Sequence, residues 1–296
     1  MTGPAGAAPV QLWTRGGYEL AEGLLWVSGR LVFVDILTGR LLESAGDQPG
    51  EAKVLAELDV PLGAVAPVAD RPGEWIAAAG TGIALLGRDG GLSWIDRPED
   101  GAAVAMRMND GCCDPAGRFW AGSMAVDVLA GAGSLYRVGP GGTVRKVLDG
   151  MTIVNGPAFT ADGSLMYVAD TFAGVIYLCR IDPATGDVTS KQIFAEIPPS
   201  EGAPDGMTVD DAGCLWVALW DGAAVRRYRS DGSVEANITV PAPRPTSVCL
   251  GGANGDRLFV TTARYGVSDP SAESGAILSA QVRATALPVA TFAGLS

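Results

Sequence analysis

The chain has 296 residues, of which 48% are apolar, and this fits one large globular domain or two modest ones. Its 33 acidic and 21 basic residues give a net charge of −12, which argues against nucleic acid or an anionic membrane surface as a partner. The chain contains no histidine, so a Ser-His-Asp triad, a Cys-His pair and every histidine-containing zinc site are excluded. Any chemistry must therefore use carboxylates, amides, hydroxyls, arginine or metal-bound water.

The N-terminal segment and the cysteines predict a cytoplasmic protein. The segment MTGPAGAAPVQLW has neither the basic region nor the apolar stretch of a signal peptide. No apolar run approaches the ~20 residues that a membrane span needs. The five cysteines are an odd number without a C-x-x-C pair, and we interpret them as reduced thiols.

A short phrase recurs along the chain: a turn rich in Asp and Gly, then an apolar run that carries an aromatic residue. It occurs six times, and successive aromatic markers are separated by 42, 45, 47, 49 and 43 residues. The copies are SGRLVFVD (28–35), GEWIAAA (73–79), DPAGRFWAGS (114–123), ADGSLMYVAD (161–170), DDAGCLWVAL (210–219) and ANGDRLFVTT (253–262), with the markers Phe33, Trp75, Trp120, Tyr167, Trp216 and Phe259. Further strand candidates lie between the markers, among them GIALLG, SLYRVG, VIYLCRID and AVRRYRSDG.

Several short strands per unit, repeated every ~40–50 residues, are typical of β-propeller blades. Six units predict an all-β fold in a single domain over residues 1–296: a six-bladed β-propeller with four-stranded antiparallel blades around a central channel. The strand-like segments VQLW (10–13) and GAILSAQVRA (275–284) are expected to share the last blade, which would remove an exposed edge. A β-sandwich with an appendage is the alternative.

Polar residues occur at one phase of this repeat. Residues at the same phase should occupy equivalent positions around the channel. About 11–13 positions before each marker, the chain has Glu22, Gly63 or Ala64, Asn109, Asn155, Asp205 and Thr246. Oxygen ligands from Glu22, Asn155 and Asp205, completed by water, best suit Ca²⁺, Mg²⁺ or Mn²⁺, with Zn²⁺ and Fe²⁺ as alternatives. Taken singly, each residue could instead be a turn residue, because Asn-Gly and Asp-Gly pairs favour turns.

The ordered motifs resemble the SMP-30 (regucalcin)/gluconolactonase/LRE-like family of six-bladed propellers over nearly the whole chain. The matching motifs are Glu22-Gly23 with Trp26 and VDI (34–36), RMNDGCCDPAGRFWAGSM (107–124), NGPAFTADGSLMYVADT (155–171), PDGMTVDDAGCLWVALW (204–220) and RPTSVCLGG (244–252). The resemblance implies one divalent cation held by Glu22, Asn155 and Asp205. It also implies that Arg107 and Asn109 bind substrate oxygens and that Asp205 is the general base.

The sequence departs from the family after Gly-Ser-Met (122–124), where animal members carry a substrate-binding acidic pair and this chain has Val126 and Asp127. Asp127 could reach sugar hydroxyls with one carbon less than Glu, and Val126 cannot form hydrogen bonds. The sugar preference is therefore open. Asp170-Thr171 also matches a family motif near the pocket, and a turn at a strand end explains it equally well.

The family's typical reaction is hydrolysis of a sugar lactone to the aldonic acid, and the resemblance implies this activity here. One divalent cation (Ca²⁺, Zn²⁺, Mg²⁺, Mn²⁺ or Fe²⁺) would polarise the lactone carbonyl, so no histidine is required. The chain has no G-x-S-x-G elbow and no Gly-rich phosphate loop, which argues against a serine esterase and against nucleotide binding.

Two other functions stay open: a phosphotriesterase or other ester hydrolase that uses the same metal site, and a non-catalytic propeller that binds a metal or a protein. The expected partner is a small-molecule sugar lactone. We expect a monomer, because a closed propeller has no edge strand that demands a partner.

Overall fold

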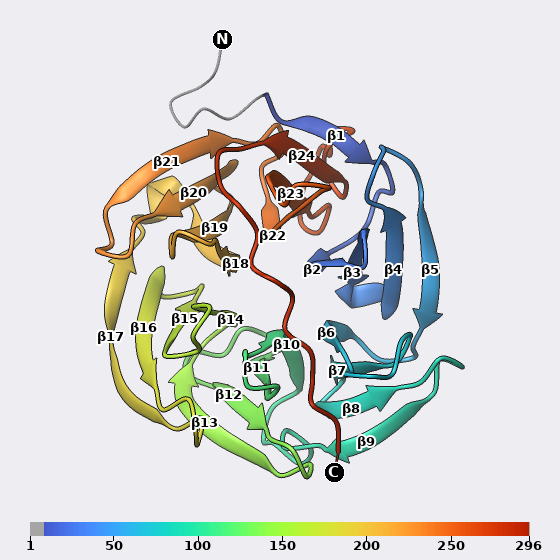
Figure 1. Ribbon diagram of the computed structural model, residues 1–296, viewed down its shortest axis with the longest axis vertical. Coiled ribbons are helices and arrows are strands. Elements are labelled where there is room, and N and C mark those ends of the chain that lie inside the picture. The colour runs from blue at the N-terminus through green and yellow to red at the C-terminus, as the bar shows by residue number, and fades with distance from the viewer. Residues whose placement is uncertain (1–8, 296) are drawn as a thin grey trace.

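The computed structural model describes residues 9–295 and arranges 24 strands in six four-stranded antiparallel sheets around a central axis (Figure 1). The expected six-bladed β-propeller is confirmed. Within the described residues the helices are two 3₁₀ turns, η1 (Ile36–Thr38) and η2 (Pro199–Glu201), and neither is long and apolar enough to cross a membrane. Residues 1–8, part of the segment in which a signal peptide was sought, lie outside the described chain.

In each blade the first strand lines the channel and the fourth lies at the periphery (Figure 1). The strands of blades 1 to 3 are β2 (Ala21–Val27), β3 (Arg30–Asp35), β4 (Arg40–Ala45), β5 (Ala52–Glu57); β6 (Leu62–Pro67), β7 (Trp75–Ala79), β8 (Gly82–Leu86), β9 (Leu92–Asp96); β10 (Met106–Cys113), β11 (Phe119–Ala125), β12 (Gly133–Val138) and β13 (Val144–Met151). Those of blades 4 to 6 are β14 (Val154–Phe159), β15 (Leu165–Asp170), β16 (Val175–Ile181), β17 (Val188–Glu196); β18 (Ala203–Val209), β19 (Leu215–Trp220), β20 (Ala224–Tyr228), β21 (Val234–Thr239); β22 (Pro245–Gly251), β23 (Arg257–Thr262), β24 (Ile277–Gln281) and β1 (Gln11–Thr14).

Blade 6 contains both ends of the chain. Its strand order is β22, β23, β24 and then β1, which runs antiparallel to β24 with Leu12 opposite Leu278. The first strand of the chain thus completes a sheet whose other strands are the last three. Ladder hydrogen bonds hold the ring closed, and the edge of β24 is covered.

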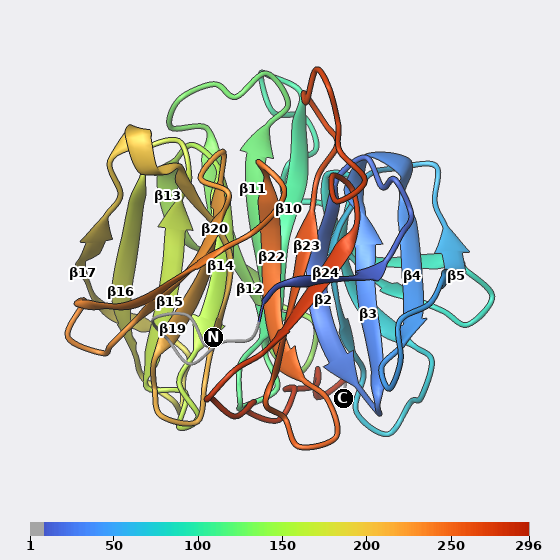
Figure 2. The ribbon, with the colours of Figure 1, turned by 90° about the horizontal axis from the view of Figure 1, so that it is seen from above.

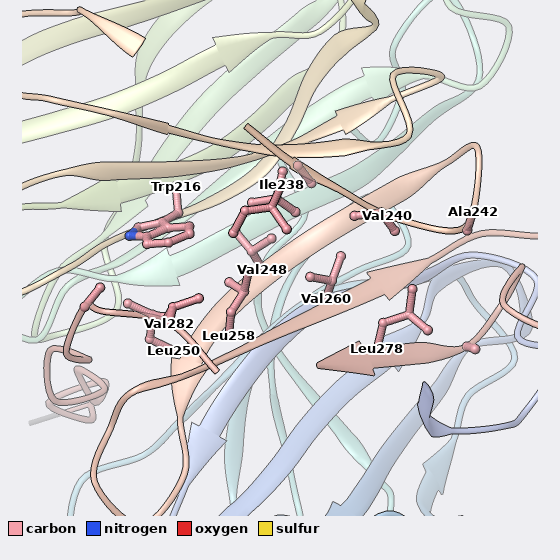
Figure 3. Packing of buried hydrophobic residues seen from close by; sticks show 14 residues of the cluster. Trp216, Ile238, Val240, Ala242, Val248, Leu250, Leu258, Val260, Leu278 and Val282 are labelled. Atoms are coloured by element: carbon pink, nitrogen blue, oxygen red, sulfur yellow. The ribbon is translucent and has the colours of Figure 1, made fainter. Parts of the chain in front are cut away.

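The recurring aromatic residue occupies the second strand of every blade. Trp75 is 7% exposed and the other five markers are 2% exposed or less. The central residues of the second strand are apolar because neighbouring blades cover both of its faces. Figure 3 shows this packing between blades 5 and 6, where Trp216 and Ile238 meet the aliphatic side chains of β22 and β23, including Val248 and Leu258. Burial of each large apolar side chain contributes about 1.5–3 kcal/mol.

All six channel-lining strands share a β-bulge at the same point. The register with the second strand shifts between Glu22 and Leu25, Leu62 and Ala64, Met108 and Gly111, Asn155 and Ala158, Pro204 and Met207, and Pro245 and Val248. A bulge redirects a side chain. The common phase of polar residues in the sequence therefore coincides with a common backbone irregularity around the channel.

The two faces of the propeller differ (Figure 2). The channel strands begin at the upper face of this view, where the loop between β23 and β24 rises above the ring. Residues 283–295, which we call the C-terminal strap, cross the lower face (Figures 1 and 2). The strap links blade 6 to blades 2 and 3, because the backbone N–H groups of Ala286, Phe292 and Ala293 donate to Gly255, Pro67 and Gly117 at 2.8, 2.8 and 3.0 Å. A cavity of about 600 Å³ lies between the strap and the lower halves of the channel strands.

Candidate active site

The three residues predicted to bind a metal all lie in the upper half of the channel. Glu22 and Asn155 are the second residues of β2 and β14, and Asp205 is the third residue of β18. All three are 3–4% exposed. The carboxyls of Glu22 and Asp205 lie within hydrogen-bonding reach of each other, so blades 1 and 5 place their acids at one point.

Glycines follow these residues for a backbone reason. Gly23 and Gly156 have φ values of 58° and 77°, a region that side chains with a Cβ rarely adopt. Each glycine belongs to the bulge that redirects the preceding side chain. The Glu22-Gly23 and Asn155-Gly156 pairs therefore form the backbone bulge and also direct a polar side chain into the site.

Burial dominates the electrostatics of the carboxyls. Desolvation raises the pKa values of Glu22 and Asp205 well above their ordinary range, and the charge of nearby Asp110 adds to both shifts. Burial also raises the pKa of Asp110 to about 7, although the backbone N–H groups of Gly111 and Gly156 donate to it at 2.7 and 2.9 Å. None of the ion pairs found among residues 9–295 includes any of these three acids.

This donor set fits a hard divalent cation. Buried carboxyls that repel one another and have no ion-pair partner favour a cation between them. Oxygen donors from two carboxylates and an amide suit the metals expected from the sequence. No group of three or more His, Cys, Asp or Glu side chains placed to hold a metal occurs within the described chain, and the set of Glu22, Asn155 and Asp205 has an amide as its third donor.

Arg107 and Asn109 lie beside these ligands on β10. Arg107 Nη1 donates to Asn109 Oδ1 at 2.7 Å and to the Met108 carbonyl at 3.0 Å. Burial lowers the pKa of Arg107 to about 10, while the charges of Glu22 and Asp205 act in the opposite direction, so the guanidinium stays protonated at neutral pH. Asn109 Nδ2 donates to Asn155 Oδ1 at 2.9 Å, which joins the two predicted groups of residues.

The other predicted positions are not part of this buried group. Asp127 is exposed on the loop between β11 and β12, and none of the hydrogen bonds within the described chain joins its side chain to the channel residues. Thr246 is fully buried, and its hydroxyl bonds to the Ala21 carbonyl and to Thr261, which ties blade 6 to blade 1. Gly63 allows close backbone contact, because a Cβ there would lie 2.0 Å from the Asn109 carbonyl oxygen. Blade 2 therefore contributes backbone alone at this phase.

Three further residues were not assigned a role from the sequence. Asp110 lies inside a matched motif, and the pair Asp110-Gly111, which directly follows Asn109, was the available signal. Thr171 accepts a hydrogen bond from Asn155 Nδ2 at 2.7 Å. Tyr265 is 50% exposed on the loop between β23 and β24, and its phenol is close enough to raise the pKa of Arg107. No repeat position points to Tyr265, because it lies in an irregular loop.

Comparison with known proteins gives a consistent result. Residues 20–264 match the SMP-30/gluconolactonase/LRE-like region. The chain is 38% identical to the pentonolactonase of Haloferax volcanii over 87% of this chain and 86% of that protein. It is 32% identical to the L-arabinolactonase of Azospirillum brasilense over 98% and 97% of the two chains. Its structure is similar to that of a calcium-binding protein, regucalcin, from Agrobacterium tumefaciens, with a TM-score of 0.87, 27% identity and 97% of each chain covered.

Proposed function

The chain belongs to the SMP-30/gluconolactonase/LRE-like family, and we propose that it hydrolyses a sugar lactone to the corresponding aldonic acid with the help of a divalent cation. The observation that carries this proposal is the burial of Glu22, Asn155 and Asp205 around one channel, next to the half-buried Arg107. The names of the two lactonase relatives support the substrate class.

The carboxylates of Glu22 and Asp205 and the amide oxygen of Asn155 would hold the cation, which is Ca²⁺, Zn²⁺, Mg²⁺, Mn²⁺ or Fe²⁺. When bound, it would polarise the lactone carbonyl and stabilise the negative charge that develops on the carbonyl oxygen. The calcium-binding regucalcin from Agrobacterium tumefaciens, which has the same fold, supports a divalent cation without identifying the one used here.

The protein's own side chains would bind the lactone and move one proton. Arg107 would donate hydrogen bonds to lactone oxygens, whereas Asn109, whose Nδ2 already donates to Val154 and Asn155, would accept one from a lactone hydroxyl at Oδ1. The hydrogen bond from Arg107 to Asn109 fixes their relative position. Asp205 accepts a proton from the attacking water as the water oxygen bonds to the carbonyl carbon. The bond between that carbon and the ring oxygen then breaks, and the ring oxygen takes up the proton. Burial makes Asp205 a stronger base than an exposed Asp, and a bound cation acts in the opposite direction.

The loops around the upper end of the channel would contact the rest of the sugar. Val126, Phe172 and Tyr265 are 58%, 64% and 50% exposed on loops of blades 3, 4 and 6. Aromatic and aliphatic side chains can pack against the C–H face of a sugar ring. Asp127, next to Val126, is our candidate for hydroxyls farther from the carbonyl.

A cytoplasmic location is part of the proposal. All five cysteines are free thiols, and burial raises the pKa of each one. Unpaired, unreactive thiols suit a reducing compartment.

The deciding experiment is hydrolysis of a lactone panel followed with a pH indicator. The substrates are glucono-, galactono-, xylono- and arabinonolactone, and the protein is stripped with a chelator before single divalent cations are added back. We expect one cation to restore the rate with a clear preference among the sugars. Tight cation binding without acceleration over spontaneous ring opening would contradict the proposal.

A further inference from the structure

A series of hydrogen bonds connects blade 5 to Arg107 through the two asparagines of the site. Thr171 Oγ1 donates to the Pro204 carbonyl at 2.7 Å. Asn155 Nδ2 donates to Thr171 Oγ1 at 2.7 Å, and Asn109 Nδ2 donates to Asn155 Oδ1 at 2.9 Å. Arg107 Nη1 completes the series by donating to Asn109 Oδ1 at 2.7 Å.

The chemistry at the two ends sets the direction of every bond in this series. The Pro204 carbonyl can only accept, so the single proton of the Thr171 hydroxyl is used there and its oxygen is left to accept. The Asn155 amide must then turn its nitrogen toward Thr171 and its oxygen away. At the other end a guanidinium can only donate, which turns the Asn109 oxygen toward Arg107. Asn109 Nδ2 also donates to the Val154 carbonyl at 3.0 Å, so the same orientation is favoured twice.

We propose that Thr171 is a positioning residue that holds the Asn155 amide with its oxygen, the atom able to bind a cation, directed into the channel. This inference rests on the proposed metal-dependent function. Without the hydroxyl, the Asn155 nitrogen loses its acceptor. The amide can then rotate and present N–H groups, which a cation repels.

Thr171 also contacts the backbone beside a second proposed ligand. Its acceptor, Pro204, immediately precedes Asp205 on β18. One hydroxyl therefore spans blades 4 and 5 and supports both Asn155 and the strand that carries Asp205. The backbone of Thr171 is held separately, since its N–H donates to the Ile153 carbonyl at 3.0 Å and its carbonyl accepts from Gly174 at 3.1 Å. A variant that lacks only the hydroxyl should therefore keep this turn.

The test is Thr171→Val, which removes the donor and the acceptor at nearly constant volume, measured beside Thr171→Ser, which keeps both. Calorimetric titration of chelator-stripped protein with Ca²⁺, and with Mn²⁺ as a second probe, gives the cation dissociation constant. Loss of a group that orients a metal ligand costs about 10–100-fold in affinity. We expect a rise of this size for Thr171→Val and less than about threefold for Thr171→Ser. Thr189→Val, on the outer strand of blade 4, removes a hydroxyl bonded to the Arg180 carbonyl and should change nothing.

Repeating Thr171→Val in an Asn155→Asp variant distinguishes a lost amide orientation from a general disturbance of the site. In Asn155→Asp, both side-chain atoms that can face the cation are oxygens, so the direction of the group no longer matters. Thr171→Val should then cause little further loss of cation affinity. An unchanged dissociation constant for Thr171→Val alone, or an equal loss in the Asn155→Asp background, would overturn the inference. If the wild-type protein binds neither cation and hydrolyses no lactone, the proposed function itself fails.

Discussion

Two groups of buried carboxylates in this propeller have opposite surroundings. Asp114 and Asp210 lie in the turns that follow the channel strands of blades 3 and 5, and both are 1% exposed. Asp210 accepts hydrogen bonds from Trp216 Nε1 at 2.8 Å and from Arg227 Nε at 2.9 Å, besides two backbone N–H groups. Asp114 likewise accepts from Trp120 Nε1 at 2.9 Å, and its arginine is Arg118, four residues along the chain, whose Nε donates at 2.6 Å.

In the channel, Glu22 and Asp205 come from different blades and face each other without an ion-pair partner. The carboxylates in the turns are neutralised inside their own blade, where they connect its strands. Those in the channel raise the free energy of the empty protein and can be stabilised by a ligand. The comparison shows that the same residue type supports the fold in one region and the site in the other.

The largest effect is expected from Asp205→Asn. Loss of a general base lowers kcat by about 10²–10⁴-fold. Because one of two repelling buried carboxyls is removed, the unfolding midpoint of the metal-free protein should stay equal or rise. Lactone hydrolysis and urea denaturation of the same preparation measure both quantities. Retained turnover would remove Asp205 from its catalytic role.

Asp210→Asn should have the reverse profile. It removes the buried partner of Arg227 and leaves only Glu235, which is partly exposed. Breaking a buried pair costs about 3–5 kcal/mol in the free energy of unfolding, and because Glu235 remains we expect a loss at the lower end of this range. The kcat of the protein that remains folded should match the wild type, because the turn lies outside the channel. Urea denaturation and lactone kinetics on the same preparation measure both quantities. A loss of stability no larger than that of a surface substitution would show that Asp210 does not stabilise the fold in the way proposed.

Removal of the metal should lower the thermal midpoint only of proteins whose channel site still binds the cation, because binding stabilises the native state. A cation present at 100 times its dissociation constant stabilises the native state by about 2.7 kcal/mol, so a chelator should lower the thermal midpoint of the wild type. Asp210→Asn should show a shift of the same size, whereas Asp205→Asn should show almost none. Scanning calorimetry with and without chelator tests this, and equal shifts in both variants would place the cation elsewhere.

The smallest effect is expected for Trp216→Phe. This change removes one hydrogen-bond donor to Asp210 and little apolar surface, and a single hydrogen bond contributes about 0.5–1.5 kcal/mol. The arginine contacts of Asp210 remain, so stability should fall by much less than in Asp210→Asn. A loss as large as in Asp210→Asn, measured by the same denaturation, would mean that the tryptophan and not the ion pair holds this turn.

The sequence predicted the fold because its signal is local and repeated. A strand covered on both faces must be apolar, so an aromatic residue recurs at 42 to 49 positions. The phase of polar residues located Glu22, Asn155 and Asp205, since equivalent positions of a ring face one axis. The expected substrate contact Asp127 is exposed on a loop, where no repeat constrains the backbone.

The parts of the site that the sequence did not predict depend on contacts between blades. In the sequence Asp110 has the pattern of a turn residue, and its raised pKa comes from burial in the assembled channel. Thr171 matters through partners on β14 and β18, and Tyr265 through Arg107 on β10. These contacts between blades correspond to no regular spacing in the sequence.

The number of blades, the strands within them and the residues that point toward the axis could be predicted from the sequence, because they follow from apolar periodicity and turn chemistry within about fifty residues. Which of those groups meet, which carboxyls form no ion pair and which way the amides turn depend on the assembled fold. Closure of the ring brings together β2, β14 and β18 from distant parts of the chain. Hydrogen-bond direction and desolvation exist only once that closure has buried these side chains.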